Sequence, residues 1–216
     1  KSVFENTYIK SLLPPLPLRY YEKSQIKVED INESQISVID CGLESIQIQN
    51  NIIDNKVSAV NGQLSFEYLT TAIDAALNGD IQGIVTGPVS KESWRLAGID
   101  YTGHTTCLKA LTQSEEVSMG FYSSKLKTVL ATVHIPLSKV SSSLTEKHLD
   151  IALKNSRQLM RMSGVQNPKI ALAGLNPHAG ENGQFGTEEK ELLIPFAEKN
   201  SHAGLSGPYP PDTLYF

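Results

Sequence analysis

Segments with helix-like and strand-like periodicity alternate along this 216-residue chain from residue 64 onward. Apolar residues recur at helical spacing over 64–77, and an asparagine-glycine pair stands at each end of that segment. This alternation predicts an α/β fold with a mixed or mostly parallel sheet flanked by helices. The expected strands are 84–85, 117–122, 128–133 and 169–173, and the expected helices are 64–77, 90–97, 105–111, 143–163 and one capped by Thr187.

The first sixty residues are patterned more weakly. Residues 36–39 and 46–48 alternate like short strands, whereas the prolines at 14, 15 and 17 exclude a helix interior. We therefore expect a partial N-terminal α/β subdomain segment over 1–60 and a central α/β region over 61–216, which carries the functional motifs. The chain has no initiator methionine and stops after a proline-rich turn at 207–213, so we expect it to be part of a longer protein.

Composition excludes several classes of protein. A formal net charge of −4 argues against a nucleic-acid-binding surface. No apolar run approaches the roughly 20 residues that a membrane-spanning helix needs. The two cysteines, Cys41 and Cys107, have no metal-binding or redox spacing. They predict a reducing compartment, and we expect a cytoplasmic protein without nucleic-acid or membrane partners.

Three histidines are candidate ligands. His134 and His178 each follow an expected strand, where ligands of open α/β sheets bind, and His104 lies in a glycine-flanked turn that enters a helix. Neutral imidazole is a common ligand for zinc and similar ions, although each ring alone could also be an ordinary hydrogen-bonded loop histidine. His148 and His202 lie in polar settings and are interpreted as ordinary surface residues.

Three further features carry charge or backbone donors. The glycine-rich loop 180–187 opens a helix and could bind an anion or form a plain tight turn. Lys91 follows an expected strand and could pair with a substrate carboxylate or phosphate, or be solvated. Asp212 stands in the turn 207–213 and could hold a catalytic water or a lysine, or only start the turn.

Taken together, these strings resemble the 4-hydroxythreonine-4-phosphate dehydrogenase family of vitamin B6 biosynthesis. The most informative is Gly174-Leu175-Asn176-Pro177-His178-Ala179-Gly180-Glu181. The others occur in the family's order with similar intervals, and the resemblance extends from about Val57 to the end of the chain. They are residues 85–91, 97–99 with 102–105, 131–137, 186–189, and 207–208 with 212–213.

The resemblance implies a role for each matching residue. His134 and His178 match two of the family's three metal-binding histidines, and His104 with Thr105 matches its substrate-contacting pair. Asp212 matches an acid near the reacting centre and Lys91 a motif lysine, so both are candidate catalytic residues. The family uses NAD and a divalent metal, most often zinc, with magnesium or cobalt as alternatives. It works as a homodimer with the active site at the interface.

The resemblance also implies a fold and a reaction. The expected build is that of the isocitrate and isopropylmalate dehydrogenases, with two subdomains and a cleft between them. The expected reaction is the NAD-dependent oxidation and decarboxylation of 4-phosphooxy-L-threonine to 3-amino-2-oxopropyl phosphate. The chain departs from the family pattern in its start, which lacks a Gly-Asp-Pro-type segment, and in Ser90, where other members often carry histidine. The family's third metal histidine lies in a downstream string that is absent from these residues.

Alternatives to this reaction remain open. A paralogous dehydrogenase would oxidise phosphorylated threonate or erythronate, or a cyclic dihydrodiol, with the same metal chemistry. A metal-dependent hydrolase would use the same histidines to activate water and would turn over without NAD. A non-catalytic binding module would hold no metal at all.

Overall fold

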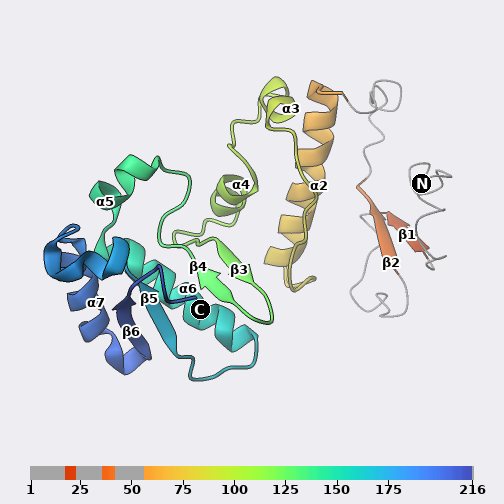
Figure 1. Ribbon diagram of the computed structural model, residues 1–216. Coiled ribbons are helices and arrows are strands. Elements are labelled where there is room, and N and C mark those ends of the chain that lie inside the picture. Colours follow the sequence, from red (N-terminus) through yellow and green to blue (C-terminus); the bar gives the residue numbers. More distant parts are fainter. Residues whose placement is uncertain (1–17, 23–35, 42–55, 216) are drawn as a thin grey trace. The chain divides into compact units, whose positions relative to one another are not determined.

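The computed structural model describes residues 18–22, 36–41 and 56–215. It divides into two compact units, unit 1 over 1–114 and unit 2 over 115–216, which we describe separately (Figure 1). The expected boundary between residues 60 and 61 stays a prediction, because most of residues 1–60 lies outside the described ranges.

Unit 1 contains a two-stranded parallel sheet. β1 (Leu18–Glu22) pairs with β2 (Ile36–Asp40), with Tyr20 opposite Val38. The strand expected at 36–39 is confirmed, whereas β1 was not predicted, because its sequence does not alternate. The strand expected at 46–48 lies outside the described residues.

The helix expected over 64–77 is confirmed as α2 (Ala59–Leu77), but it begins earlier than predicted. The Ser58 hydroxyl caps it by accepting a hydrogen bond from the Asn61 N–H at 3.1 Å. Gly62, expected as part of a start signal, lies inside the helix instead. A Cβ on Gly62 would stand 2.1 Å from the Ser93 carbonyl oxygen, so glycine permits the close approach of α2 to the segment that follows.

Two short helices complete unit 1, α3 (Lys91–Leu96) and α4 (His104–Leu111), and both match the predicted ranges. They pack with α2 around Trp94, which is fully buried and donates its indole N–H to the Ser65 hydroxyl at 2.9 Å. The buried core of this unit consists of Leu69, Ile73, Trp94 and Cys107. The buried strand predicted at 84–85 is wrong: Ile84 packs on this core, but Val85 is fully exposed and no described strand pairs with it.

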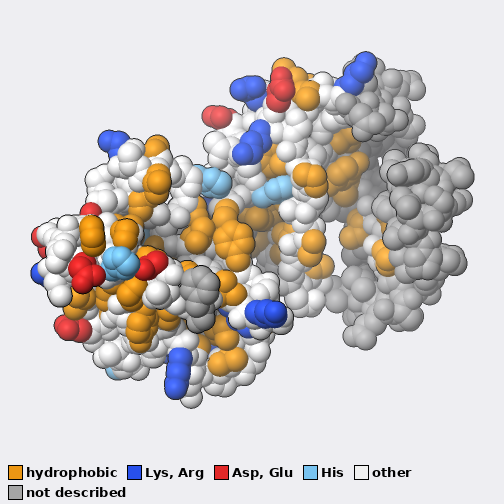
Figure 2. All heavy atoms as spheres, in the orientation of Figure 1, with side chains coloured by type: hydrophobic (Ala, Val, Ile, Leu, Met, Phe, Trp, Pro, Cys, Tyr) orange, Lys and Arg blue, Asp and Glu red, His pale blue; other side chains and the backbone are white. Residues whose placement is uncertain are grey.

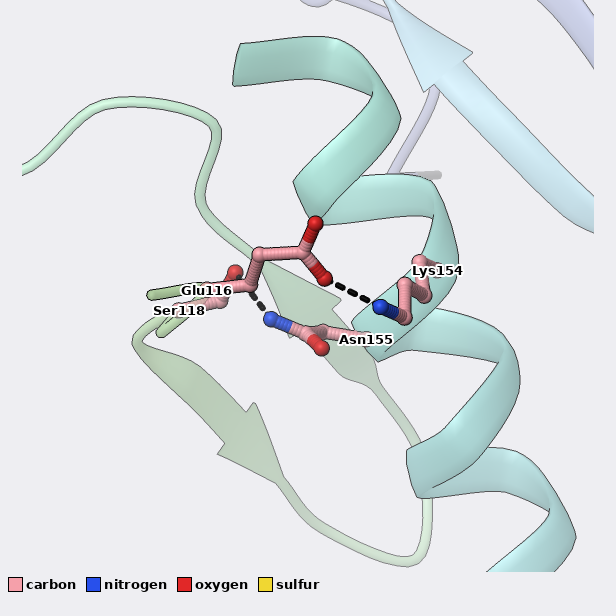
Figure 3. A network of polar contacts seen from close by, with 4 residues as sticks. All are labelled: Glu116, Ser118, Lys154 and Asn155. Carbon is pink, nitrogen blue, oxygen red and sulfur yellow. Dashed lines mark hydrogen bonds and ion pairs between the residues drawn. The ribbon is translucent and has the colours of Figure 1, made fainter. Parts of the chain in front are cut away.

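Unit 2 begins with the predicted hairpin. β3 (Gly120–Tyr122) pairs antiparallel with β4 (Lys127–Val129). The long helix α6 (Glu146–Met162) packs against it and ends before Gly164, as predicted. Figure 3 shows the polar contacts between α6 and the segment that precedes β3: Asn155 donates to the Ser118 hydroxyl at 2.9 Å, and Lys154 pairs with Glu116.

The start of α6 differs from the prediction. Ser143 and Glu146 have the spacing of a capping box, but Ser143 ends the short helix α5 (Val140–Ser143), which follows η3 (Leu137–Lys139). Thr145 is the residue before α6, and its hydroxyl bonds to the His148 ring at 2.8 Å rather than to a backbone N–H. The capping-box prediction is therefore wrong.

A second parallel pair forms the other half of unit 2. β5 (Ile170–Ala173) pairs with β6 (Leu205–Tyr209), and Ala173 lies opposite Tyr209. Residues 207–208 were predicted to form a turn, but they lie within β6, where Gly207 allows the chain to approach the Leu172 carbonyl oxygen. Between the strands run the 3₁₀ segment η4 (Pro177–Gly183), the π-helical turn η5 (Glu189–Leu193), α7 (Ile194–Lys199) and η6 (Ser201–Ala203).

The core of unit 2 lies between α6, α7 and the β5–β6 pair. It consists of Leu149, Leu153, Leu193, Phe196, Ala197 and Leu205. Hydrophobic side chains also reach the surface of both units (Figure 2), among them Leu137, which is 90% exposed. The predicted α/β class with a mixed set of strands is confirmed. No helix among the described residues is both long enough and apolar enough to span a bilayer.

Candidate metal and substrate site

His178 and Asp212 form the most specific polar contact among the predicted site residues. The His178 ring nitrogen Nδ1 lies 2.9 Å from Asp212 Oδ2, and the His178 backbone N–H donates to Asp212 Oδ1 at 3.3 Å. β5 and β6 are parallel neighbours, and these two residues follow their carboxyl ends. The loops after such strands meet at one edge of the sheet, which explains how residues 34 apart come into contact.

This contact uses Nδ1 of the imidazole and leaves its second nitrogen, Nε2, available for a ligand. When a carboxylate accepts the Nδ1 proton, the neutral ring presents the lone pair of Nε2 to a ligand. The His178 side chain is 56% exposed. The arrangement matches the carboxylate–histidine pairs that orient metal ligands in proteins.

The segment that carries His178 has an unusual backbone. Residues 178–182 all have positive φ, between 38° and 78°, and only Gly180 among them lacks a side chain. The left-handed region costs an ordinary residue about 1–2 kcal/mol. Such strain persists where surrounding contacts impose it, and it is often found at functional sites.

Two acids that follow the loop bond to the residues just before it. Glu189 is 2% exposed and accepts hydrogen bonds from the backbone N–H groups of Leu175 at 2.8 Å and Asn176 at 2.7 Å. The Asn176 side-chain amide donates to Glu189 at 2.9 Å and to Glu188 at 2.8 Å. Lys190 bonds to the Asn182 carbonyl from the other side of the loop.

Glu188 has a perturbed acidity. The Ser141 hydroxyl donates to its carboxylate at 2.5 Å, and this bond is the main cause that lowers the pKa of Glu188. The backbone N–H of Glu188 and the Asn176 amide lower this pKa further. Glu188 and Glu189 both bond to other segments, Glu188 to Ser141 and Asn176 and Glu189 to Leu175 and Asn176.

His134 is placed differently from His178. It lies in a turn after β4, has a φ of 57° and is exposed. Within the described ranges its ring has no hydrogen-bond or ion-pair partner. Those ranges also contain no group of three or more His, Cys, Asp or Glu side chains that could hold a metal ion. The metal-ligand roles of His134 and His178 stay predictions.

The predicted substrate residues gather in unit 1 around the start of α4. His104 is the first residue of this helix, Thr105 the second, and the His104 ring packs against Trp94 with a centroid distance of 5.9 Å. The Lys91 side chain passes the same turn, since its Cε lies 3.6 Å from the Cβ position of Gly103. A lysine beside a helix N-terminus suits an anionic group.

Unit 2 also contains a large cavity. Its volume is about 540 Å³, and apolar side chains of β4, β5 and α6 line most of it. Neither His178 nor Asp212 contributes to its lining, so it is not the candidate site.

Sequence reasoning missed Asn176, Glu188, Glu189 and Ser141. A signal was present: the glycines at 180 and 186 bracket the loop. A Cβ on Gly180 would stand 2.7 Å from a Glu189 oxygen, and one on Gly186 would stand 2.4 Å from a Glu188 oxygen. The loop 180–187, for which anion binding and a plain tight turn were both left open, thus lies against the protein's own carboxylates.

Comparison with known proteins identifies the family of the chain. A family model described as "Pyridoxal phosphate biosynthetic protein PdxA" matches residues 2–216. This range is longer than the expected resemblance from Val57 onward, so that limit was wrong. A 4-hydroxythreonine-4-phosphate dehydrogenase of Desulforapulum autotrophicum is 41% identical over 158 residues, which cover 72% of this chain and 46% of that protein.

Two further relatives extend the comparison. A D-threonate 4-phosphate dehydrogenase of Salmonella typhimurium is 40% identical over 162 residues, covering 74% of this chain and 50% of that protein. The crystal structure of a 4-hydroxythreonine-4-phosphate dehydrogenase from Klebsiella pneumoniae has a TM-score of 0.80 at 34% identity, covering 94% of this chain and 60% of that one. The chain therefore spans about half the length of the curated relatives it matches.

The fold is that of an α/β protein, and the relatives that it matches are named as dehydrogenases. This chain belongs to the PdxA family of pyridoxal phosphate biosynthetic proteins.

Proposed function

We propose that the protein containing this chain catalyses the NAD-dependent oxidation and decarboxylation of 4-phosphooxy-L-threonine to 3-amino-2-oxopropyl phosphate. The substrate's secondary alcohol loses a hydride to NAD and a proton to solvent, and the resulting β-keto acid loses carbon dioxide. Family membership and the names of the relatives support the reaction class. The single observation that carries the proposal is the 2.9 Å contact between His178 Nδ1 and Asp212 Oδ2.

A divalent metal fits the donor chemistry of this contact. Asp212 fixes the ring so that His178 Nε2 is free to bind, and His134 supplies a second exposed imidazole. Zinc is the preferred candidate because imidazole suits it, with magnesium or cobalt as alternatives. When bound, the metal supplies Lewis-acid polarisation of the substrate hydroxyl. In this proposal Asp212 acts by orienting His178.

Within unit 1, the residues around the start of α4 are the proposed substrate-binding residues. Lys91 and the N-terminus of α4 attract its negative phosphate or carboxylate group. His104 and Thr105 donate hydrogen bonds, and Trp94 holds the His104 ring in place from the core. These residues therefore position the substrate, while NAD supplies the hydride acceptor when bound.

The test is an assay of the intact protein with zinc, NAD and 4-phosphooxy-L-threonine. We expect NADH and carbon dioxide in equal amounts, and loss of both after metal removal by a chelator. Absence of NADH with every metal tried would overturn the proposal.

A second candidate substrate is D-threonate 4-phosphate. The Salmonella typhimurium relative of that name is 40% identical to this chain, almost as similar as the 4-hydroxythreonine-4-phosphate dehydrogenase at 41%. The two substrates differ at the amino group, so kcat/KM for each in the same assay decides between them.

Two other classes of protein would give different experimental results. A metal-dependent hydrolase turns over without NAD, and a binding module retains no zinc in elemental analysis. We also propose a homodimer, which light scattering of the intact protein tests, and a cytoplasmic location, which the two free cysteines support.

A further inference from the structure

Glu189 is a buried acid to which the proposed chemistry gives no task. It follows the glycine-rich loop at the start of η5, and only 2% of its surface is exposed. Among the described residues no lysine, arginine or histidine forms an ion pair with it. Burying a carboxylate without a cation is costly unless hydrogen bonds compensate for the lost water.

Three hydrogen bonds provide that compensation, and they all come from one short segment. Glu189 Oε1 accepts from the backbone N–H groups of Leu175 and Asn176, at 2.8 and 2.7 Å, and Oε2 accepts from the Asn176 side chain at 2.9 Å. These backbone groups lie just beyond the end of β5. Inside a sheet, the carbonyl groups of a neighbouring strand would accept hydrogen bonds from such backbone N–H groups. Here the Glu189 carboxylate accepts them instead.

The loop is shaped around this carboxylate. A Cβ on Gly180 would stand 2.7 Å from Glu189 Oε2, closer than real Cβ atoms approach. Gly180 lies in the middle of the left-handed run 178–182, which begins two residues after Asn176. The Glu189 carboxylate therefore lies against the left-handed segment 178–182 at Gly180, and His178 is the first residue of that segment.

We propose that Glu189 is a positioning residue, which fixes the backbone of Leu175 and Asn176 and thereby the direction of His178 toward Asp212. This inference rests on the proposed role of His178 as a metal ligand. Glu189 acts through acceptance of hydrogen bonds and through its length, not through contact with substrate.

The first test measures hydrogen exchange in the intact protein without metal. We expect the peptide that contains Leu175 and Asn176 to exchange roughly tenfold faster in Glu189→Ala than in the wild type, because both amides lose their acceptor. Glu191→Ala is the matched control: Glu191 is exposed on the same turn, and its removal should change nothing. Unchanged exchange in a folded Glu189→Ala protein overturns the proposal.

The second test measures zinc affinity by titration with the metal alone. Loss of a residue that orients a ligand weakens metal binding by about tenfold to a hundredfold, and we expect this for Glu189→Asp, which is one methylene too short. Glu189→Gln retains an oxygen for both backbone amides and loses only the acceptor for the Asn176 side chain, so its zinc affinity should fall less than that of Glu189→Asp. Equal zinc affinity of the Glu189→Asp and Glu189→Gln variants overturns the proposal. This test remains decisive if Glu189→Ala does not fold.

The two tests separate this inference from the proposed function. If His178→Ala leaves zinc affinity unchanged, the ligand assignment fails, and the zinc arm of the Glu189 proposal fails with it. The exchange experiment still decides whether Glu189 fixes the 175–176 backbone, because it needs neither metal nor substrate.

Discussion

Asp212 contacts His178 twice, once at the ring nitrogen Nδ1 and once at the backbone N–H. A single contact would leave the ring free to rotate, whereas the pair fixes both the main chain and the side chain. We expect Asp212→Ala to weaken zinc binding by the intact protein by about tenfold to a hundredfold. Asp212→Asn retains acceptor oxygen and should lose less. Equal affinity of Asp212→Ala and wild type would show that the ring needs no such orientation.

Removal of either proposed ligand should have a larger effect. We expect His134→Ala and His178→Ala each to abolish stoichiometric zinc binding, as measured by elemental analysis after gel filtration. His202→Ala is the control, since His202 is exposed in η6 and outside the proposed site. A full equivalent of zinc retained by either ligand variant would refute the assignment of that residue.

Lys91 allows a test of the proposed substrate-binding residues in unit 1. If its ammonium attracts the substrate's anionic end, Lys91→Met should raise KM for the phosphorylated substrate by about tenfold, in line with the loss of one charge-assisted hydrogen bond. Steady-state kinetics with Lys109→Met as control measures this, because Lys109 is exposed in the last turn of α4. An unchanged KM in Lys91→Met would make Lys91 an ordinary solvated lysine.

Gly62 should resist the substitution that usually stabilises a helix. Alanine normally improves a helix interior by about 1 kcal/mol over glycine. Here the new Cβ would stand 2.1 Å from the Ser93 carbonyl oxygen, so we expect Gly62→Ala to lower the free energy of unfolding by about 2 kcal/mol. Gly83→Ala, with nothing within 4 Å of its Cβ position, should have little effect. Urea denaturation compares the two, and a stabilised Gly62→Ala would contradict the close approach.

Glu188 predicts a particular pH dependence. Its folded-state pKa lies below the ordinary value of 4.5, mainly because of the Ser141 hydroxyl. The stabilisation is therefore complete above the unfolded-state pKa and is lost as the pH falls through the lowered folded-state pKa. We expect the wild type to exceed Ser141→Ala in free energy of unfolding by less than about 1 kcal/mol at neutral pH. This difference should shrink in acid below pH 4.5, and a difference that grows there would contradict the assignment.

The helices and most strands could be predicted from sequence because their periodicity records which face is buried. α2, α3, α4 and β5 therefore appear close to their predicted ranges. The failures have different causes. Val85 is fully exposed, and the Thr145 hydroxyl bonds to the His148 ring instead of a backbone N–H. Gly207 approaches the Leu172 carbonyl oxygen, a contact with a distant segment on which local turn signals contain no information.

The candidate site, too, could be predicted only in part from the sequence. The residue types and the family resemblance identify His178 and Asp212 as candidates, but only the parallel pairing of β5 with β6 brings them together. Burial of the Glu189 carboxylate was not predicted, because it depends on the fold of the preceding loop. The glycines at 180 and 186 mark that loop, but their spacing does not indicate which acid it encloses.

A crystal structure of the zinc-loaded intact protein, with the ion located by its anomalous scattering, tests the central claim most directly. We predict a single ion about 2.0–2.1 Å from Nε2 of both His134 and His178, with Asp212 on the far side of the His178 ring. An ion bound elsewhere, or the two imidazoles in separate environments with no shared ion, would contradict the claim.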